Sequence, residues 1–270
     1  MNVYQEIDYF YNRYRGKKCV IGKSAFGRDL FAFFVGDDDG PTGICQYAMH
    51  AREWITAYLA LEHISRGVRG GVWFFPLINP DGALLATEGI GSVEDVAQRQ
   101  FLIDINGSED FSLWKANGEA VDLNVNFPAR WGGGIRNVCK PASAHYIGDF
   151  PLCAPETRAL AEFTLRLSPD YTISWHAKGE EIYWRFHQPL LRAIRDKRLG
   201  KRLARVTGYP LREAPLSAGG YKDWCVETLE IPAYTVEAGN DDLSHPLGMD
   251  VLEELKVKCG NAVRAFTEGF

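Results

Sequence analysis

The chain has 270 residues, and its 30 lysines and arginines against 35 aspartates and glutamates give a formal net charge of −5. This acidic balance argues against nucleic-acid binding, which usually needs a basic excess. No apolar run is long enough to span a bilayer, and the polar N-terminus lacks a signal-peptide pattern. We therefore expect a cytoplasmic protein without a nucleic-acid or membrane partner.

Short apolar runs alternate with amphipathic segments along most of the chain. Strands are predicted at 19–22, 30–36, 44–49, 72–79, 171–176, 181–184 and 233–238. A periodicity near 3.6 residues predicts helices at about 2–14, 53–67, 155–168, 189–206, 222–229 and 247–267. This alternation predicts an α/β fold with a mixed, mostly parallel central sheet flanked by helices.

The segment from about 80 to 155 lacks a clear periodicity. It contains turn sequences such as NPDG, NGSED and FPARWGGG, in which glycine, proline and asparagine interrupt regular structure. Its tryptophans and phenylalanines favour ordered functional loops over disorder. Since no repeat or linker divides the sequence, residues 1–270 are expected to form a single catalytic domain.

Three residues at predicted strand ends have the chemistry of a zinc site. His50 and Glu53 lie in MHAREW after one apolar strand, and His176 follows another in SWHAKG. A catalytic zinc takes three protein ligands, and sites in open α/β sheets gather at the carboxyl ends of strands. The remaining histidines fit less well and are expected to be surface or structural residues: His63, His145, His187 and His245.

A third strand end supplies a candidate base. Glu237 ends the apolar run in YTVEAG, and a carboxylate is a common acceptor for the proton of an attacking water. Taken alone, a solvated residue at the rim of the sheet explains this glutamate more simply. The ligands at neighbouring strand ends favour the general base.

These segments together resemble the zinc carboxypeptidase family, also called funnelins, across essentially the whole chain. MHAREW resembles the HxxE signature of the family, LINPDG its turn after a strand, and VDLNVNFP its DxNRNF segment; SWHAKG and TVEAG resemble the third-ligand and catalytic-glutamate strands. The resemblance implies one Zn²⁺ per chain, held by His50, Glu53 and His176. It also implies that Glu237 serves as general base and then acid.

The resemblance assigns further roles around these residues. Asp122 would accept a hydrogen bond from the imidazole of His50 and orient it, and Arg52 would face the substrate. Lys115 stands where the family commonly has an arginine that polarises the scissile carbonyl, and its charge would serve the developing oxyanion.

Two positions depart from the pattern of ordinary carboxypeptidases. The family holds the terminal carboxylate of its substrate with an Asn-Arg pair, but here Asn124 is followed by Val125. A valine cannot pair with a buried carboxylate, which would be costly to leave alone. The tyrosine of the family aligns with Pro215, although Tyr221 is close enough in sequence to replace it.

These departures favour a particular branch of the family. WKAN, DLNVNFPARW and GGYKDW are similar to bacterial peptidases that cleave the γ-D-glutamyl–L-diamino acid bond of peptidoglycan stem peptides. A conventional metallocarboxypeptidase with a displaced carboxylate anchor stays open, as does an amidase or deacylase of small acylated amino acids. A metal-free peptidoglycan-binding pseudoenzyme is a third alternative, which the complete set of ligands and base disfavours.

Lys222 bears on the choice of substrate. In GGYKDW it occupies the position that, in the family, lines the pocket for the side chain of the leaving residue. We expect its ammonium to attract the second carboxylate of diaminopimelate, unless Lys222 points to solvent or pairs with Asp223.

The six cysteines form neither a CxxC nor a CxxH cluster, which disfavours a structural zinc knuckle. Cys139 and Cys153 bracket a loop and are candidates for pairing under oxidation, whereas buried free thiols are the default in a cytoplasmic enzyme.

Overall fold

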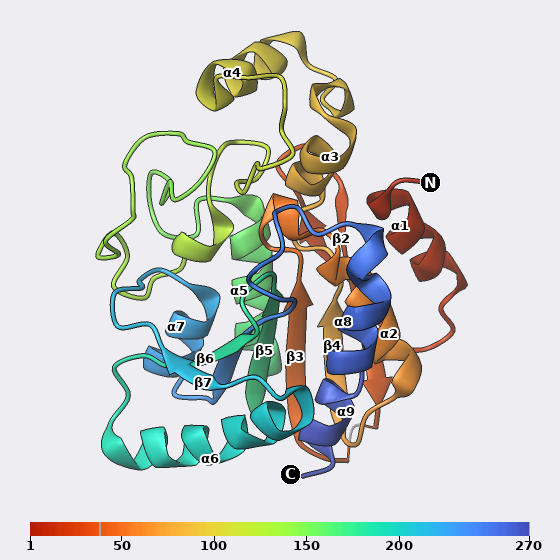
Figure 1. Ribbon diagram of the computed structural model, residues 1–270, viewed down its shortest axis with the longest axis vertical. Helices are drawn as coiled ribbons and strands as arrows, with labels where there is room; N and C mark the ends of the chain where they lie inside the picture. Colours follow the sequence, from red (N-terminus) through yellow and green to blue (C-terminus); the bar gives the residue numbers. More distant parts are fainter. Residues whose placement is uncertain (38, 270) are drawn as a thin grey trace.

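One mixed sheet runs through this computed structural model, which describes residues 1–37 and 39–269 (Figure 1). Its eight strands in the described residues are β1 Lys18–Lys23, β2 Asp29–Gly36, β3 Thr42–Tyr47, β4 Gly71–Phe75, β5 Tyr171–His176, β6 Glu181–Arg185, β7 Leu211–Glu213 and β8 Ala233–Glu237. The order across the sheet is β1-β2-β4-β3-β5-β8-β6-β7. The central strands β4, β3, β5 and β8 are parallel, and β2 and β6 join them antiparallel. The predicted fold class is confirmed.

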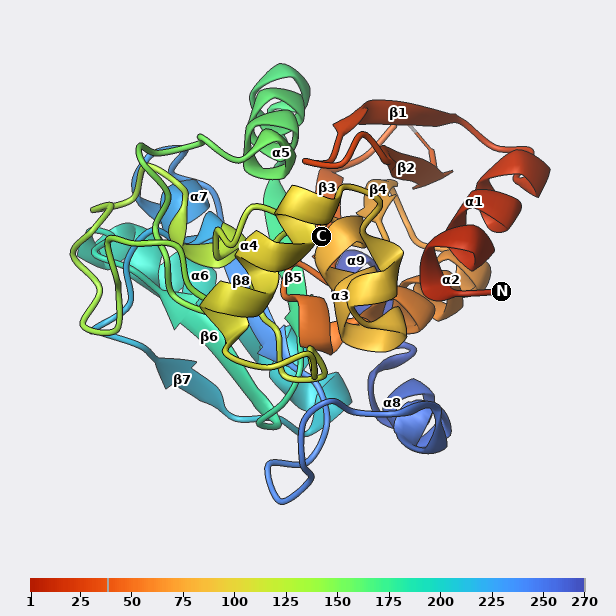
Figure 2. The ribbon, with the colours of Figure 1, turned by 90° about the horizontal axis from the view of Figure 1, so that it is seen from above.

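Helices cover both faces of the sheet. They are α1 Val3–Arg13, α2 Thr56–Arg66, α3 Pro80–Glu88, α4 Val96–Asn106, α5 Pro155–Leu167, α6 Leu190–Thr207, α7 Tyr221–Glu227, α8 Leu252–Cys259 and α9 Ala262–Thr267. One core joins the sheet to α1, α2, α6, α8 and α9, and a second joins the other face to α5 and α7. Figure 2 accordingly shows α5 and α8 on opposite sides of β3 and β5.

This double covering explains the continuous apolar strands. Every residue of β4 and β5 is buried, as expected for parallel strands between two layers of helices. Strand β1 lies at the edge of the sheet and is only partly buried. Within the described residues, no helix combines the length and apolarity needed to cross a bilayer.

The segment from 80 to 155 is more regular than predicted. It contains α3 and α4, so the expectation of loops throughout was wrong for 80–106. The NPDG sequence begins a helix, because the Asn79 side chain accepts a hydrogen bond from the Gly82 amide at 2.9 Å and proline suits the first helical turn. Asp95 caps α4 in the same way, through the Gln98 amide at 2.7 Å. Residues 107–154 contain a short 3₁₀ turn, Leu123–Val125, and an isolated β-bridge between Val138 and Tyr146.

Three elements also differ from prediction. The helix expected from residue 53 begins at Thr56, after a 3₁₀ turn over Ala51–Glu53. The helix expected over 247–267 is divided into α8 and α9, which are separated by Gly260 and Asn261. Strand β7 was missed, because its three residues are too few to show a period.

His63 is a structural residue, as predicted. It is buried on α2, where its Nδ1 accepts a hydrogen bond from the Tyr47 hydroxyl at 2.6 Å and its Nε2 donates to the Cys259 carbonyl at 2.9 Å. Burial lowers the pKa of His63 to about 4. This imidazole therefore joins β3, α2 and α8 as a neutral group. Cys139 and Cys153 are both free thiols, so the structure does not pair them.

Candidate active site

A tight turn after β3 presents the first two predicted ligands. The chain leaves β3 at Tyr47 and continues through His50 into the 3₁₀ turn that contains Glu53. The hydroxyl of Thr56 fixes this turn, since it accepts from the Ala48 amide at 2.8 Å and donates to the Glu53 carbonyl at 2.9 Å. Both side chains are thereby held at the carboxyl end of β3.

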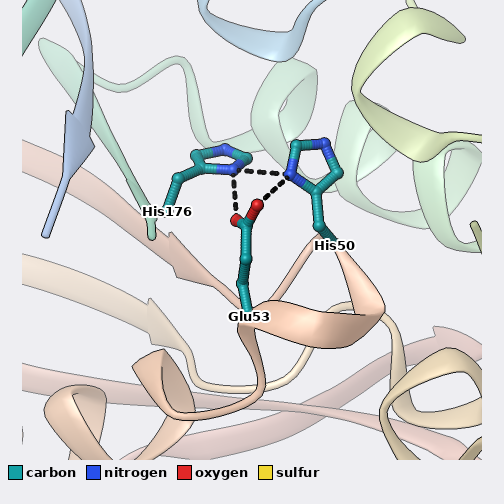
Figure 3. A group of neighbouring side chains, drawn as sticks. All are labelled: His50, Glu53 and His176. Carbon is teal, nitrogen blue, oxygen red and sulfur yellow. Dashed lines mark hydrogen bonds and ion pairs between the residues drawn. The ribbon is translucent and has the colours of Figure 1, made fainter. Parts of the chain in front are cut away.

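Sheet pairing brings the third ligand to them. Strands β3 and β5 are parallel neighbours, and Tyr47 lies opposite Trp175, the residue before His176. Figure 3 shows the side chains of His50, Glu53 and His176 pointing toward one another. Glu53 Oε1 lies 2.8 Å from His50 Nδ1, and Glu53 Oε2 lies 2.9 Å from His176 Nδ1. One ligand atom from each residue falls within 4.8 Å of the other two.

This arrangement fits zinc. The two Nδ1 atoms are 3.1 Å apart, and two imidazole lone pairs facing each other in a buried site repel unless a cation or a proton lies between them. Two histidines and one glutamate are a donor set found in catalytic zinc sites. The convergence of three buried donor atoms on one point therefore has the chemistry of a zinc-binding site.

Asp122 supports the site from behind His50. Its Oδ1 lies 3.4 Å from His50 Nε2, and its Oδ2 lies 2.9 Å from Lys115 Nζ. The carboxylate also accepts from the His145 amide at 2.9 Å. Burial alone would raise the pKa of Asp122, but the charges of Lys115 and His50 hold it well below the usual value. Asp122 is therefore an ionised group that can orient one ligand and the nearby lysine.

Glu237 lies beside the metal ligands. It ends β8, where it is opposite His176 on β5 and Glu181 on β6. Burial raises the pKa of Glu237 to about 7, although the charge of His176 opposes this shift. A carboxylate with a pKa near neutrality can both accept and return a proton.

A cavity of about 520 Å³ opens beside these residues. Most of the predicted site residues outside the zinc cluster line it, namely Lys115, Asn124, Lys222 and Glu237, together with the ligand His50. Further lining residues were not predicted from the sequence: Arg136, His145, Tyr183, Ser217 and Asp223. Arg136 and His145 come from the irregular segment between 107 and 154, which offered no periodic pattern from which to place them.

Two predicted substrate residues, Tyr221 and Arg52, lie differently from expectation. Tyr221 is fully buried and its hydroxyl lies 2.8 Å from that of Thr164, so it belongs to the core and not to the cavity. Tyr183 is a tyrosine that does line the cavity, and it had been missed. Arg52 is partly buried at the 3₁₀ turn and does not border this cavity.

Comparisons with known proteins agree with this geometry. Residues 3–247 match the family described as "Zinc carboxypeptidase", peptidase M14. The chain belongs to the zinc carboxypeptidase family. His50, Glu53 and His176 form its zinc-site triad.

Relatives within the family differ in the activity that their names state. The chain is 32% identical over 241 residues to gamma-D-glutamyl-L-diamino acid endopeptidase 1 of Lysinibacillus sphaericus, an alignment covering 82% of this chain and 60% of that protein. It is 24% identical over 269 residues to metallocarboxypeptidase A of Trichophyton tonsurans, with 81% and 57% covered. The chain thus spans about 60% of the length of these relatives.

A solved structure supports the fold independently. The bovine thrombin-activatable fibrinolysis inhibitor, in complex with tick carboxypeptidase inhibitor, aligns with a TM-score of 0.80 at 18% identity. The alignment covers 100% of this chain and 96% of that one. The chain therefore has the carboxypeptidase A-like fold.

Proposed function

We propose that this zinc carboxypeptidase homologue hydrolyses the amide bond between γ-D-glutamate and an L-diamino acid in peptidoglycan stem peptides. The observation that carries the proposal is the cavity wall at Asn124 and Val125. Where ordinary family members place an arginine for the terminal carboxylate, this wall has the apolar side chain of Val125. The similarity to a relative named for this activity supports the proposal.

The residues around the cavity have separate roles in amide hydrolysis. Zinc bound by the triad would supply a Lewis acid and lower the pKa of a water molecule. Glu237 borders the cavity next to the triad, so it takes the proton of the attacking water and returns it to the leaving amine. Its pKa of about 7 suits both transfers near neutral pH.

Lys115 stabilises negative charge on the acyl oxygen. Its ammonium lies 2.9 Å from Asp122 and borders the cavity, so one N–H is held by the aspartate while the others remain for the substrate. A lysine acts as a point charge here, without the planar fork of an arginine. Asp122 therefore positions both His50 and this lysine.

One observation favours a second candidate, a conventional metallocarboxypeptidase. Arg136 comes from a different segment but lines the same cavity as Val125. A guanidinium there can hold a substrate carboxylate from another direction. Under this alternative, Arg136 is the displaced anchor for ordinary C-terminal residues.

A small substrate panel decides between the two. Zinc-loaded protein is incubated with L-Ala-γ-D-Glu-meso-diaminopimelate, its lysine analogue and a plain peptide with a free C-terminus. We expect cleavage of the γ-D-glutamyl substrates, little release from the plain peptide, and weak gain of that release in Val125→Arg. Efficient release from the plain peptide by the wild type, lost in Arg136→Ala, would favour the carboxypeptidase instead.

A further inference from the structure

A buried ion pair forms part of the cavity wall. Lys222 and Asp223 are 6% and 2% exposed, and the ammonium of Lys222 donates to Asp223 Oδ1. Lys222 also donates to the Arg185 carbonyl at 3.2 Å, and Ser217 Oγ donates to Asp223 Oδ2 at 3.2 Å. Lys222, Asp223 and Ser217 all line the same cavity as Glu237.

Stability alone does not account for this pair. It belongs to the first turn of α7, whose other residues Tyr221, Trp224 and Cys225 are packed in the core. Taking two charges out of water costs about as much as their attraction returns, so an apolar pair of similar volume is often at least as stable. A pair that faces a cavity has a use that a core pair lacks: both charges can meet a ligand.

Strand β6 places the base at one of its ends and the pair at the other. Glu181 on β6 is opposite Glu237 on β8, and Arg185, whose carbonyl holds Lys222, ends the same strand. Four residues of strand correspond to about 13 Å. Tyr183 and Thr235, which are paired between these two levels, line the intervening cavity. This placement suits a leaving residue with a long side chain.

We propose that Lys222 and Asp223 together recognise an amino-acid zwitterion at the far end of the leaving residue's side chain. This inference rests on the proposed function and specifies its diamino acid. In meso-diaminopimelate the far end carries both an ammonium and a carboxylate, three methylene groups from the reacting centre. Its carboxylate meets Lys222 and its ammonium meets Asp223, so each charge in the pocket faces an opposite charge.

The pairing changes the expectation drawn from Lys222 alone. A lone lysine would select any side-chain carboxylate. Because Asp223 is bound to it, a carboxylate without an ammonium leaves Asp223 facing negative charge. An L-lysine side chain has the reverse defect, since its ammonium meets Asp223 but also approaches Lys222. Specificity then comes from the like-charge repulsion that arises when a ligand carries only one of the two charges.

Three substrates that differ only at this far end test the proposal. They are L-Ala-γ-D-Glu linked to meso-diaminopimelate, to L-lysine and to L-2-aminopimelate, which keeps the carboxylate and lacks the ammonium. We expect the wild type to cleave the first with a kcat/KM at least about tenfold above the other two. Lys222→Met should prefer the lysine substrate, and Asp223→Asn the aminopimelate substrate. Lys256→Met, which removes a lysine from an ion pair on α8, is the matched control and should keep the wild-type order.

Each outcome separates the inference from the function on which it rests. Equal kcat/KM for the three substrates leaves the γ-D-glutamyl peptidase standing and overturns the zwitterion site. If the wild type cleaves none of them, the proposed function fails, and calorimetry with free meso-diaminopimelate, lysine and 2-aminopimelate decides the site: tighter binding of the first upholds it, and equal binding overturns it. The same calorimetry on the wild type decides the matter if either variant fails to fold.

Discussion

Two regions beside β3 bury histidines in opposite circumstances. Around His63 both ring nitrogens have protein partners, the Tyr47 hydroxyl and the Cys259 carbonyl. Around His176, Nδ1 lies 3.1 Å from the Nδ1 of His50 and 2.9 Å from Glu53 Oε2, and Nε2 has no hydrogen-bond partner in the part of the chain that the structure describes. A buried polar group is costly unless it is satisfied. In the first region the protein satisfies both ring nitrogens of His63, whereas in the second the facing Nδ1 atoms of His50 and His176, beside Glu53, require a cation.

The surroundings of the two regions explain the difference. His63 lies within the core between the sheet and α2, α8 and α9, where burial favours the uncharged imidazole. His50 and His176 lie at strand ends beside Glu53, and Asp122 lies behind His50. Carboxylates beside imidazoles favour a cation. Burial therefore does not by itself distinguish a structural histidine from a ligand; the hydrogen-bond partners do.

Removal of a ligand should produce the largest effect. We expect His50→Ala and His176→Ala to lose nearly all bound zinc and with it all measurable hydrolysis, because three protein ligands are needed to hold a catalytic zinc. Elemental analysis after gel filtration measures the metal directly. His187→Ala, at an exposed position, is the control and should retain about one zinc per chain. Full occupancy in both ligand variants would show that the cluster is not the metal site.

Glu237→Gln separates catalysis from metal binding. The variant should keep its zinc and lose roughly 10²- to 10⁴-fold in kcat, the usual contribution of a general base. Glu253→Gln changes an exposed glutamate on α8 and should leave kcat unchanged. Turnover close to the wild-type rate in Glu237→Gln would remove this residue from the mechanism.

Asp122→Asn weakens the support of the site without touching a ligand. An orienting carboxylate behind a metal-bound histidine typically contributes 10- to 100-fold in affinity, so we expect zinc affinity to fall by roughly that factor. Competition with a chelator of known affinity measures the change. An unaltered affinity would mean that the contact of 3.4 Å with His50 does not act on the metal.

The pH dependence of the free energy of unfolding tests the region around His63. The pKa of His63 is about 4 in the folded chain, against an ordinary value near 6.5. The unfolded chain therefore binds more protons between these values, and the free energy of unfolding falls as pH decreases from about 6.5 to 4. The contribution is at most about 3 kcal/mol. It is complete above about pH 6.5 and lost in acid.

Urea unfolding of metal-free wild type and His63→Gln at several pH values measures this contribution. Glutamine can make both hydrogen bonds of the neutral ring but does not titrate, so the variant should lose less stability than the wild type in acid. The difference isolates His63, because Glu156, whose pKa burial raises to about 7, contributes the opposite slope to both proteins. If the free energies of unfolding of the two proteins vary with pH in parallel, the pKa of His63 is not lowered in the folded chain.

The zinc ligands and the base could be predicted from the sequence because each of them lies at the end of an apolar strand or in the turn that follows one. Strand ends are visible in a pattern, and parallel strands bring their ends together. Arg136 and His145 were missed because an irregular segment has no period that predicts its path. Tyr221 was misplaced because proximity in sequence does not show which face of α7 packs into the core. The sequence shows that Lys222 and Asp223 are adjacent, but it does not show that both are buried in the cavity wall.

The separation of 123 residues between Glu53 and His176 has a thermodynamic consequence. An unfolded chain cannot hold these two groups together, so zinc affinity exists only once β3 and β5 have paired. Metal binding is then coupled to folding, and free zinc at 100 times its dissociation constant would add about 2.7 kcal/mol to the free energy of unfolding. A fragment that ends before β5 lacks the third ligand and forgoes this gain. Zinc bound at the active site would thus link β3 to β5 and stabilise the folded chain.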